Sequence, residues 1–254
     1  MKTIKQDSSH KIRKDMKTIK HLFWGAAILV FLFSSCEDSI SVKGNGIEAT
    51  EGRVVTNFER VKSSGSFEVH ITEGVEHEVL VRADENLIQY IETYVAGETL
   101  HIDVEGVRSL RNTLPMEVFI TTPSLEGIKL SGSGLISTGY FNTDEIDIVL
   151  SGSGNIKSAF EADEVDILIS GSGRVEVSGF ANEGDFKISG SGKIDAFELD
   201  LLYCDTNTSG SGDMWISVER SLDSRISGSG NVFYYGTPQV ETHISGSGNV
   251  IAHN

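Results

Sequence analysis

The most regularly spaced reactive groups in this sequence are the hydroxyls of a repeated tetrapeptide, Ser-Gly-Ser-Gly, whose copies recur every 18 to 20 residues. A hydroxyl both donates and accepts hydrogen bonds, so a regular row of hydroxyls is a candidate binding surface. On neighbouring strands such groups lie about 4.8 Å apart, too far to bond directly, and we expect water or a ligand to bridge them. These candidate residues are Ser131, Ser133, Ser151, Ser153, Ser170, Ser172, Ser189, Ser191, Ser209, Ser211, Ser227, Ser229, Ser245 and Ser247.

Histidines are the next candidates, since imidazole serves as a general base and as a metal ligand. No two of those after residue 36 have the i, i+4 spacing that places a zinc-binding pair on one helix face. We interpret all of them as solvated side chains: His70, His77, His101, His243 and His253. The sequence also lacks a nucleophile elbow, a phosphate loop and a dinucleotide fingerprint. We therefore predict no catalytic residue, no metal site and no cofactor.

Carboxylates are abundant and could act as acids and bases on a polysaccharide if they cluster across neighbouring coils. They recur about once per repeat, close to Phe141, Phe160 and Phe197, a position typical of a solvated corner. We interpret them as surface charge and keep polysaccharide cleavage as the alternative. They are Asp144, Glu145, Glu161, Asp163, Glu164, Glu198 and Asp200. A calcium-binding glycine-rich repeat is not expected, because its aspartate is missing from every copy except at Asp213.

The residues around each tetrapeptide alternate with a period of two, which indicates strands. In the second copy Ile146, Ile148 and Leu150 share their parity with Gly152 and Gly154, so the glycines face inward and the serines outward. The repeat is too short for a propeller blade or a paired-helix unit, and it predicts one coil of a parallel β-helix. The inward glycines fit either corners with positive φ or a narrow interior.

Residues 58–123 alternate less regularly and predict further strands, for example from Phe67 to Ile71 and from Leu100 to Val104. Asp84 to Asn86, followed by apolar residues through Val95, predicts a short helix capped by the Asp or the Asn. The predicted fold class is therefore all-β: a parallel β-helix (solenoid) with coils of about 18–20 residues, preceded by a β-rich N-terminal half with one short helix.

Composition and charge exclude several classes of protein. The formal net charge is −16, from 21 basic and 37 acidic residues. Such a chain repels phosphate backbones, so we expect no nucleic-acid partner. With 27 glycines and two cysteines, Cys36 and Cys204, the chain is neither an all-helical protein nor a disulfide scaffold. Cys204 shares the inward parity of its coil, and we interpret it as a small buried hydrophobic residue.

Residues 17–36 have the layout of a secretory signal: a basic start, an apolar run from Leu22 to Phe33, and small residues before Cys36. The apolar run of 12 residues is shorter than the roughly 20 that a spanning helix needs. Its end resembles a bacterial lipobox, so we predict lipidation at Cys36, with a plain signal-peptidase site as the alternative. Translation starting at Met16 would give a signal of ordinary length.

These features divide the chain into three parts. We predict a lipoprotein-type signal peptide over 1–35, a polar tether over 36–55, and one domain over 56–254, because no linker separates its two halves. A lipid anchor would make the membrane the first partner and place the protein in the cell envelope, as an outer membrane lipoprotein that is periplasmic or surface-exposed.

The chain resembles a known family, the auto-transporter adhesin, head GIN domain proteins of Gram-negative bacteria. The resemblance covers nearly the whole mature chain. It is carried by the segments 67–71, 84–88, 99–102 and 123–134, and by the short motifs Gly154-Asn155-Ile156, Gly230-Asn231-Val232 and Gly248-Asn249-Val250. It implies an exported β-helical protein, and it implies the fold more firmly than the function.

Three hypotheses for function follow. The first is a non-enzymatic envelope lipoprotein that presents a rigid β-helix for adhesion or assembly, with a surface glycan or a protein as its ligand. The second is a protein that cleaves or binds polysaccharide through surface carboxylates. The third is recognition of a regular lattice by the serine rows.

The sequence stops six residues after the last tetrapeptide, at Asn254. We therefore expect the final coil to leave ladder N–H and C=O groups unpaired, with Val232, Val250 and Ile251 near an open edge. We hypothesise that two copies form a homodimer through their C-terminal coils, or that another partner covers them.

Overall fold

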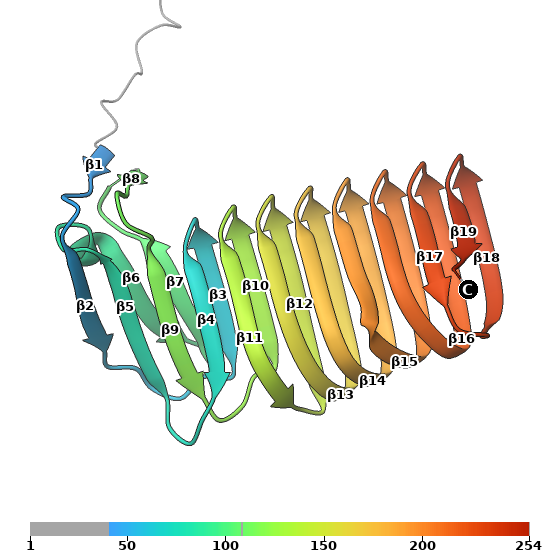
Figure 1. The fold of residues 1–254 in the computed structure, drawn as a ribbon, viewed down its shortest axis with the longest axis horizontal. Helices are drawn as coiled ribbons and strands as arrows, with labels where there is room; N and C mark the ends of the chain where they lie inside the picture. Colours follow the sequence, from blue (N-terminus) through green and yellow to red (C-terminus); the bar gives the residue numbers. More distant parts are fainter. Residues whose placement is uncertain (1–40, 108, 254) are drawn as a thin grey trace, which may run out of the picture. The chain divides into compact units, whose positions relative to one another are not determined.

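A computed structural model describes residues 41–107 and 109–253. The predicted signal peptide over 1–35, Met16 and Cys36 lie outside the described residues. The described unit is a parallel β-solenoid whose coils stack in one row that ends with the red, C-terminal strands (Figure 1). The predicted fold class is confirmed: the structure is all-β, and from β10 (Gly127–Gly132) onward equivalent residues of neighbouring coils are 18 to 20 positions apart, as in Ser151 opposite Ser170.

Each coil contributes strands to two layers that face each other across the core. Layer A contains, in stacking order, β6 (Ile91–Ala96), β7 (Thr99–Val104), β3 (Arg60–Gly65), β10 (Gly127–Gly132) and β12 (Glu145–Gly152). The second halves of the four long strands and then β18 (Gln239–Gly246) continue it. The long strands are β13 (Asn155–Gly171), β14 (Arg174–Gly190), β15 (Lys193–Gly210) and β16 (Asp213–Gly228).

Layer B contains the remaining strands of the stack. In order they are β2 (Glu48–Arg53), β5 (Glu78–Asp84), β9 (Glu117–Thr122), β4 (Glu68–Glu73) and β11 (Leu135–Asn142). The first halves of β13 to β16 follow, and then β17 (Asn231–Tyr235) and β19 (Asn249–Ala252). A separate parallel pair is formed by β1 (Ser41–Lys43) and β8 (Ser109–Arg111).

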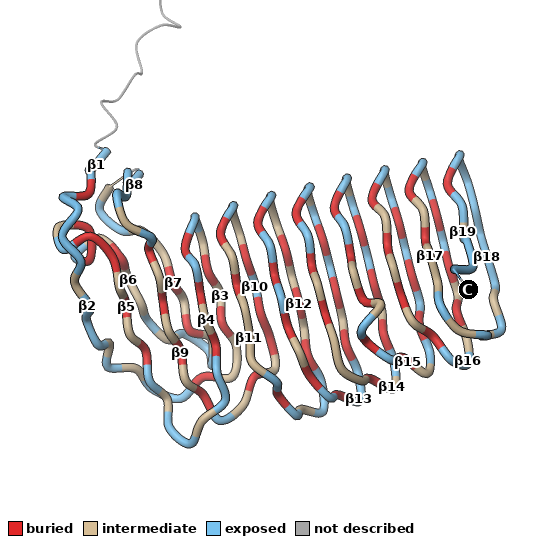
Figure 2. The backbone as a smooth tube through the Cα atoms, viewed as in Figure 1, coloured by how far each residue is buried: buried red, intermediate tan, exposed pale blue. Residues whose placement is uncertain are grey.

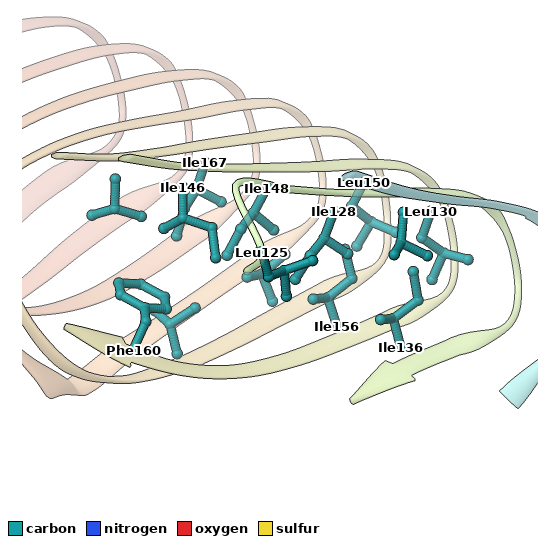
Figure 3. Close-up of a cluster of buried hydrophobic side chains, with 14 of the residues drawn as sticks. Leu125, Ile128, Leu130, Ile136, Ile146, Ile148, Leu150, Ile156, Phe160 and Ile167 are labelled. Atoms are coloured by element: carbon teal, nitrogen blue, oxygen red, sulfur yellow. The ribbon is translucent and has the colours of Figure 1, made fainter. Parts of the chain in front are cut away.

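Alternating aliphatic side chains fill the space between the layers. Ile148 of β12 pairs in register with Ile167 of β13, and both are buried. Buried and exposed residues alternate along the strands (Figure 2), and the isoleucines and leucines of successive coils pack together in Figure 3. One continuous core runs from Phe58 to Val232. Burying each aliphatic side chain contributes about 1.5–3 kcal/mol, and stacking supplies the ladder hydrogen bonds that a single coil lacks.

The tetrapeptide forms the tight corner between the layers. The sequence left two roles open for its glycines, a corner with positive φ and a narrow interior, and both apply. At Gly190 φ is +133°, which side chains rarely adopt, and a Cβ there would stand 2.5 Å from the carbonyl oxygen of Gly171, one coil below. That oxygen accepts the N–H of Ser191 at 2.9 Å. The second glycine, as at Gly192, is buried against the core.

The stacking order differs from the chain order in the N-terminal region. The coil made by β3 and β4 lies between the coil of β7 and β9 and the coil of β10 and β11, although it precedes both in sequence. Ser64 and Gly65 pair with Ser131 and Gly132, so the corner row extends one coil further than the seven tetrapeptides indicated. Phe67 replaces the last glycine of this corner, which is why the sequence pattern missed it.

Antiparallel strands close this end of the solenoid. In layer B, β2 pairs with β5 and β5 with β9, and in layer A, β6 pairs with β7. The predicted helix is a single 3₁₀ turn, η1 (Ile88–Tyr90), with no side-chain cap, and Ile91 already begins β6. The cap prediction is wrong because buried Asp84 accepts N–H groups of other segments, from Gly46 at 2.7 Å and Thr113 at 2.8 Å.

The polar tether predicted over 36–55 is wrong for most of its described part. Strand β1 and strand β2 lie within 41–53, and β2 forms a full antiparallel ladder with β5. Its polar composition reflects its place at the edge of layer B, where most of its side chains are exposed. Within residues 41–107 and 109–253, no helix is long and apolar enough to cross a membrane.

Candidate functional site

The serines form outward-facing rows, as predicted, and the structure places these rows along the corner. The first serines of the tetrapeptides pair in register from coil to coil, as Ser170 with Ser189 and Ser209 with Ser227. All fourteen candidate serines are exposed or half-buried. Their backbones hold the corner together, since Ser172 donates its N–H to Gly152 at 2.9 Å and Ser211 donates to Gly190 at 2.8 Å. The hydroxyls are thereby left on the solvent side of a rigid corner.

A row of carboxylates runs beside the first serine row in layer A, and the sequence analysis did not recognise it. Its members pair in register through successive coils: Asp147, Asp166, Asp185, Asp205, Asp223 and Glu241. Each stands four residues before the first serine of its tetrapeptide. That fixed offset was visible in the sequence, and at even spacing it places the carboxylates on the same face as the serines.

Basic side chains neutralise alternate members of this row. Arg60 pairs with Asp147, Lys187 lies 2.6 Å from Asp185, and Arg225 lies 2.5 Å from Asp223. Two carboxylates between these pairs, those of Asp166 and Asp205, have no ion pair within the described residues. One oxygen of Asp166, Oδ1, is buried without a hydrogen-bond partner.

The unpaired members hold their protons more tightly than ordinary carboxyl groups. Burial, followed by the charges of Asp185 and Asp147, raises the pKa of Asp166. Burial and the charges of Asp223 and Asp185 raise the pKa of Asp205. The row therefore alternates between ion-paired carboxylates and carboxylates that are costly to ionise.

A hollow of about 340 Å³ opens in this face of layer A. Carboxylates of Glu164, Glu183, Asp185 and Asp205 line it, together with the ring of Tyr203, whose side chain is 41% exposed. The Tyr203 hydroxyl accepts a hydrogen bond from Arg220 at 3.1 Å. The hollow thus joins an aromatic ring to several hydrogen-bond acceptors. Sugars offer matching groups, because their C–H faces pack on aromatic rings and their hydroxyls donate to carboxylates.

The carboxylates singled out from the sequence are all exposed, as expected of surface charge. Three of them, Asp144, Glu161 and Asp163, line a polar hollow of about 160 Å³ at the corner opposite the serines. Glu164 belongs to the hollow beside Tyr203, and Asp200 lines another of about 450 Å³ at the irregular part of β15. The structure therefore divides five of the seven predicted carboxylates among three hollows, and Glu145 and Glu198 line none of the three.

The histidines are less uniform than predicted. His243 and His253 are exposed, and the other three are half-buried. His253 nevertheless stacks on Phe197, with 5.6 Å between centroids. His70 packs on Phe119, His77 on Phe58, and His101 on Tyr94, with centroid separations of 5.2, 4.6 and 4.7 Å. Cys204 is buried as predicted, and burial raises the pKa of its thiol far above the ordinary value.

Comparison with known proteins places this geometry among related structures. A family model described as "Putative auto-transporter adhesin, head GIN domain" matches residues 57–238. A "putative adhesin" from Bacteroides fragilis NCTC 9343 superposes with a TM-score of 0.75 at 21% identity, over 84% of this chain and all of that one. No match is found among curated proteins.

Two structures from Parabacteroides distasonis ATCC 8503 are similar over the same region. A "putative adhesin" shares 25% identity, with a TM-score of 0.68 over 84% of this chain and all of its own. A "putative lipid binding protein" shares 24% identity, with a TM-score of 0.73 over 85% of this chain and all of its own. At 21% and 24% identity, the Bacteroides fragilis protein and the "putative lipid binding protein" establish a shared fold only.

Proposed function

The chain belongs to the auto-transporter adhesin, head GIN domain family, and from this premise we propose that it is a non-enzymatic adhesin of the cell envelope that binds glycans through layer A. The family supports an adhesin-like role at the cell surface or envelope. The glycan ligand is our own inference. It rests on the hollow beside Tyr203 and on the serine and carboxylate rows that flank it.

The single observation that carries this proposal is the in-register alignment of hydroxyl and carboxylate rows around an aromatic ring. The repeat along each row is set by the strand spacing of about 4.8 Å. A polymer of sugars could therefore meet equivalent groups on several coils at once, and each added contact would raise its apparent affinity. A rigid solenoid loses little conformational entropy when it binds such a ligand.

A glycan-binding screen on the purified protein tests the proposal. A bound glycan should lose at least about tenfold in affinity for the double variant Tyr203→Ala, Asp205→Asn, because a stacking face and an acceptor are removed. The matched control is Glu176→Gln with Asp195→Asn on layer B, which removes two carboxylates elsewhere. Equal loss of binding in both variants, or no glycan bound by the wild type, would contradict the proposal.

One observation favours a polysaccharide-cleaving enzyme as a second candidate. Neighbouring carboxylates of the row lie in different environments: burial and the charges of Asp223 and Asp185 raise the pKa of Asp205, whereas Asp185 is ion-paired with Lys187. Such a pair can divide the roles of acid and base. An assay for new reducing ends, run on each glycan found in the screen, separates the two functions: products that vanish in Asp205→Asn would identify the enzyme.

We also propose that the protein is a lipoprotein anchored through Cys36, which lies outside the described residues. Support comes from the signal layout of residues 17–36 and from the adhesin family. Two or three acyl chains would give stable attachment to the outer membrane. The variant Cys36→Ala should appear in the soluble fraction, whereas Cys204→Ala should stay in membranes. Retention of Cys36→Ala after a high-salt wash would contradict the anchor.

A further inference from the structure

A cluster of potential metal ligands lies on layer B, on the side of the solenoid opposite the glycan-binding face. It consists of Glu68 and His70 on β4 and of Glu117 on β9. One ligand atom from each of these side chains lies within 4.8 Å of the others. His70 was expected to be a solvated side chain. Glu117 is 47 positions away in the sequence, and only the stacking of β4 on β9 brings the two together.

The register of the strands forces two like charges together. Glu68 stands directly opposite Glu117 on the neighbouring parallel strand. Like charges in this relation destabilise a sheet, and a cation between them would remove the repulsion. Arg82 compensates only part of the negative charge of the two glutamates. It donates to a single oxygen of Glu117, Oε2, at 2.8 and 2.9 Å. The three side chains Glu68, Glu117 and Arg82 keep a net charge of −1.

The imidazole of His70 is oriented toward these carboxylates. Its Nδ1 lies 2.9 Å from the hydroxyl of Ser137 on β11. That hydroxyl can donate to the carbonyl oxygen of Val69 at 3.5 Å, which leaves its lone pair to accept Nδ1–H. In this arrangement Nε2 carries a lone pair, and it faces Oε1 of Glu117 at 3.9 Å. A hydrogen bond from the second ring nitrogen is the usual support of a metal-bound histidine.

The surrounding side chains restrict the movement of the cluster. The ring of His70 stacks on Phe119, with 5.2 Å between centroids and 24° between planes. The guanidinium of Arg82, on β5, also lies over the Phe119 ring, 4.8 Å from its centroid. Arg82 also holds Glu117, which is 17% exposed. Two of the three ligands are therefore held in place before any ion binds, and Glu68 is exposed and free to rotate.

We propose that Glu68, His70 and Glu117 form a binding site for a divalent transition metal ion of the zinc class. One nitrogen and two oxygens suit this ion, with water in the fourth position. Donors in a tetrahedral zinc site lie roughly 3.3 Å apart, given bond lengths of about 2.0–2.1 Å. Rotation of the Glu68 side chain can bring its carboxylate to that distance. The ion would link two strands, β4 and β9, that are distant in sequence.

The test is titration of the purified full chain with Zn²⁺ alone by calorimetry, and with Co²⁺ alone by visible absorption. We expect one equivalent to bind to the wild type. His70→Gln and Glu68→Gln should each lower the affinity at least about tenfold, and Ser137→Ala about tenfold through the lost orientation of the ring. Glu68 is exposed, so its variant keeps the test valid if His70→Gln fails to fold.

The matched control is His243→Gln. His243 also lies near two carboxylates, 3.8 Å from Glu241 and 4.0 Å from Asp223, but it is exposed and sits on layer A. The His243→Gln variant should bind Zn²⁺ with the affinity of the wild type. The proposal is overturned if the wild type binds no ion, if Glu68→Gln binds as tightly as the wild type, or if His243→Gln removes the binding.

Discussion

The regular coils from β10 to β19 and the N-terminal region from β2 to β9 reach the same solenoid by different means. In the regular coils each strand pairs with the equivalent strand of the next coil, 18 to 20 residues away, and chain order equals stacking order. In the N-terminal region the strands pair out of order and in both directions. The corners of the first region are held by glycines, whereas a buried carboxylate, Asp84, joins segments in the second.

The difference shows that a repeated sequence determines which strands pair, because each coil matches the next. At an end of the stack, the strand pairing depends on individual residues. A repeated coil offers the same groups above and below, so its stability is a sum over neighbouring pairs. The end of the stack offers one face only, and there the strands pair antiparallel, β2 with β5 and β6 with β7. Four predictions, from the largest effect to the smallest, probe this contrast.

The strongest test compares corner and hairpin glycines. Gly190→Ala should lower the free energy of unfolding by about 3–5 kcal/mol, because the new Cβ meets the Gly171 carbonyl at a strained φ. Gly97→Ala, in the hairpin between β6 and β7, should cost only about 1 kcal/mol, because its Cβ meets nothing within 4 Å. Urea melts measure both values. Equal losses would show that the corner is not close-packed.

The second test concerns the N-terminal region. Asp84→Asn should cost about 2–3 kcal/mol at pH 7, because three N–H groups lose a charged acceptor. Burial raises the pKa of Asp84, but the N–H groups of Leu114, Thr113 and Gly46 outweigh it and hold the pKa below its ordinary value of 3.8. The stabilisation is therefore present above that value and is lost as the pH falls through the lowered pKa.

Urea melts of Asp84→Asn at neutral and acidic pH check this prediction. The difference from the wild type should shrink below pH 3.8, the ordinary value for Asp. The exposed neighbour provides a control, since Glu85→Gln should change stability by less than about 0.5 kcal/mol. A difference that stays constant with pH would mean that the charge of Asp84 is irrelevant to the fold.

A smaller and opposite effect is expected in the regular coils. Asp166→Asn should raise stability by up to about 1 kcal/mol at pH 7, because it removes a charge that is partly buried and repelled by its neighbours. A raised pKa means that the native state binds the proton more tightly, so this cost falls as the pH drops toward the unfolded value. The advantage of the variant should therefore disappear in acid.

The control for this prediction is Asp185→Asn in the next coil. Asp185 is ion-paired with Lys187, so its replacement should give no gain at pH 7. Thermal melts of both variants between pH 4 and pH 7 make the comparison. If the two variants behave alike, the alternation of paired and unpaired carboxylates has no energetic meaning.

The smallest effect on stability is expected at the C-terminal edge, where Figure 2 shows an exposed strand β18. Ile244 is 45% exposed there. We propose that two copies pair through this edge, and we expect Ile244→Lys to abolish the association while changing stability by less than about 0.5 kcal/mol. Sedimentation at micromolar concentration measures the association of the two copies. Leu168→Lys, 40% exposed in mid-layer, should leave association intact, and a monomeric wild type would refute the pairing.

Most of the regular solenoid follows from local pattern. The period of two around Ile146 and Ile148 indicates strands, and the interval between tetrapeptides sets the coil length. The outward direction of the serines follows from the same parity. The carboxylate row could also have been recognised from the sequence, because Asp166 and Asp185 keep the same offset from their tetrapeptides. The many other acidic residues obscured it.

Only the tertiary structure decided the arrangement of the N-terminal region, of the candidate metal site within it, and of the hollow beside Tyr203 in the regular coils. The sequence around β3 and β4 carries only a partial corner motif, Ser64-Gly65-Ser66, and it does not show that their coil stacks between two later ones. The partners of Arg60, Thr99 and Gly127, are 39 and 67 residues away in the sequence. The meeting of His70 with Glu117 depends on that stacking. A repeat carries its pairing rule in every copy, whereas a single long-range pairing is selected by the packing of the whole core.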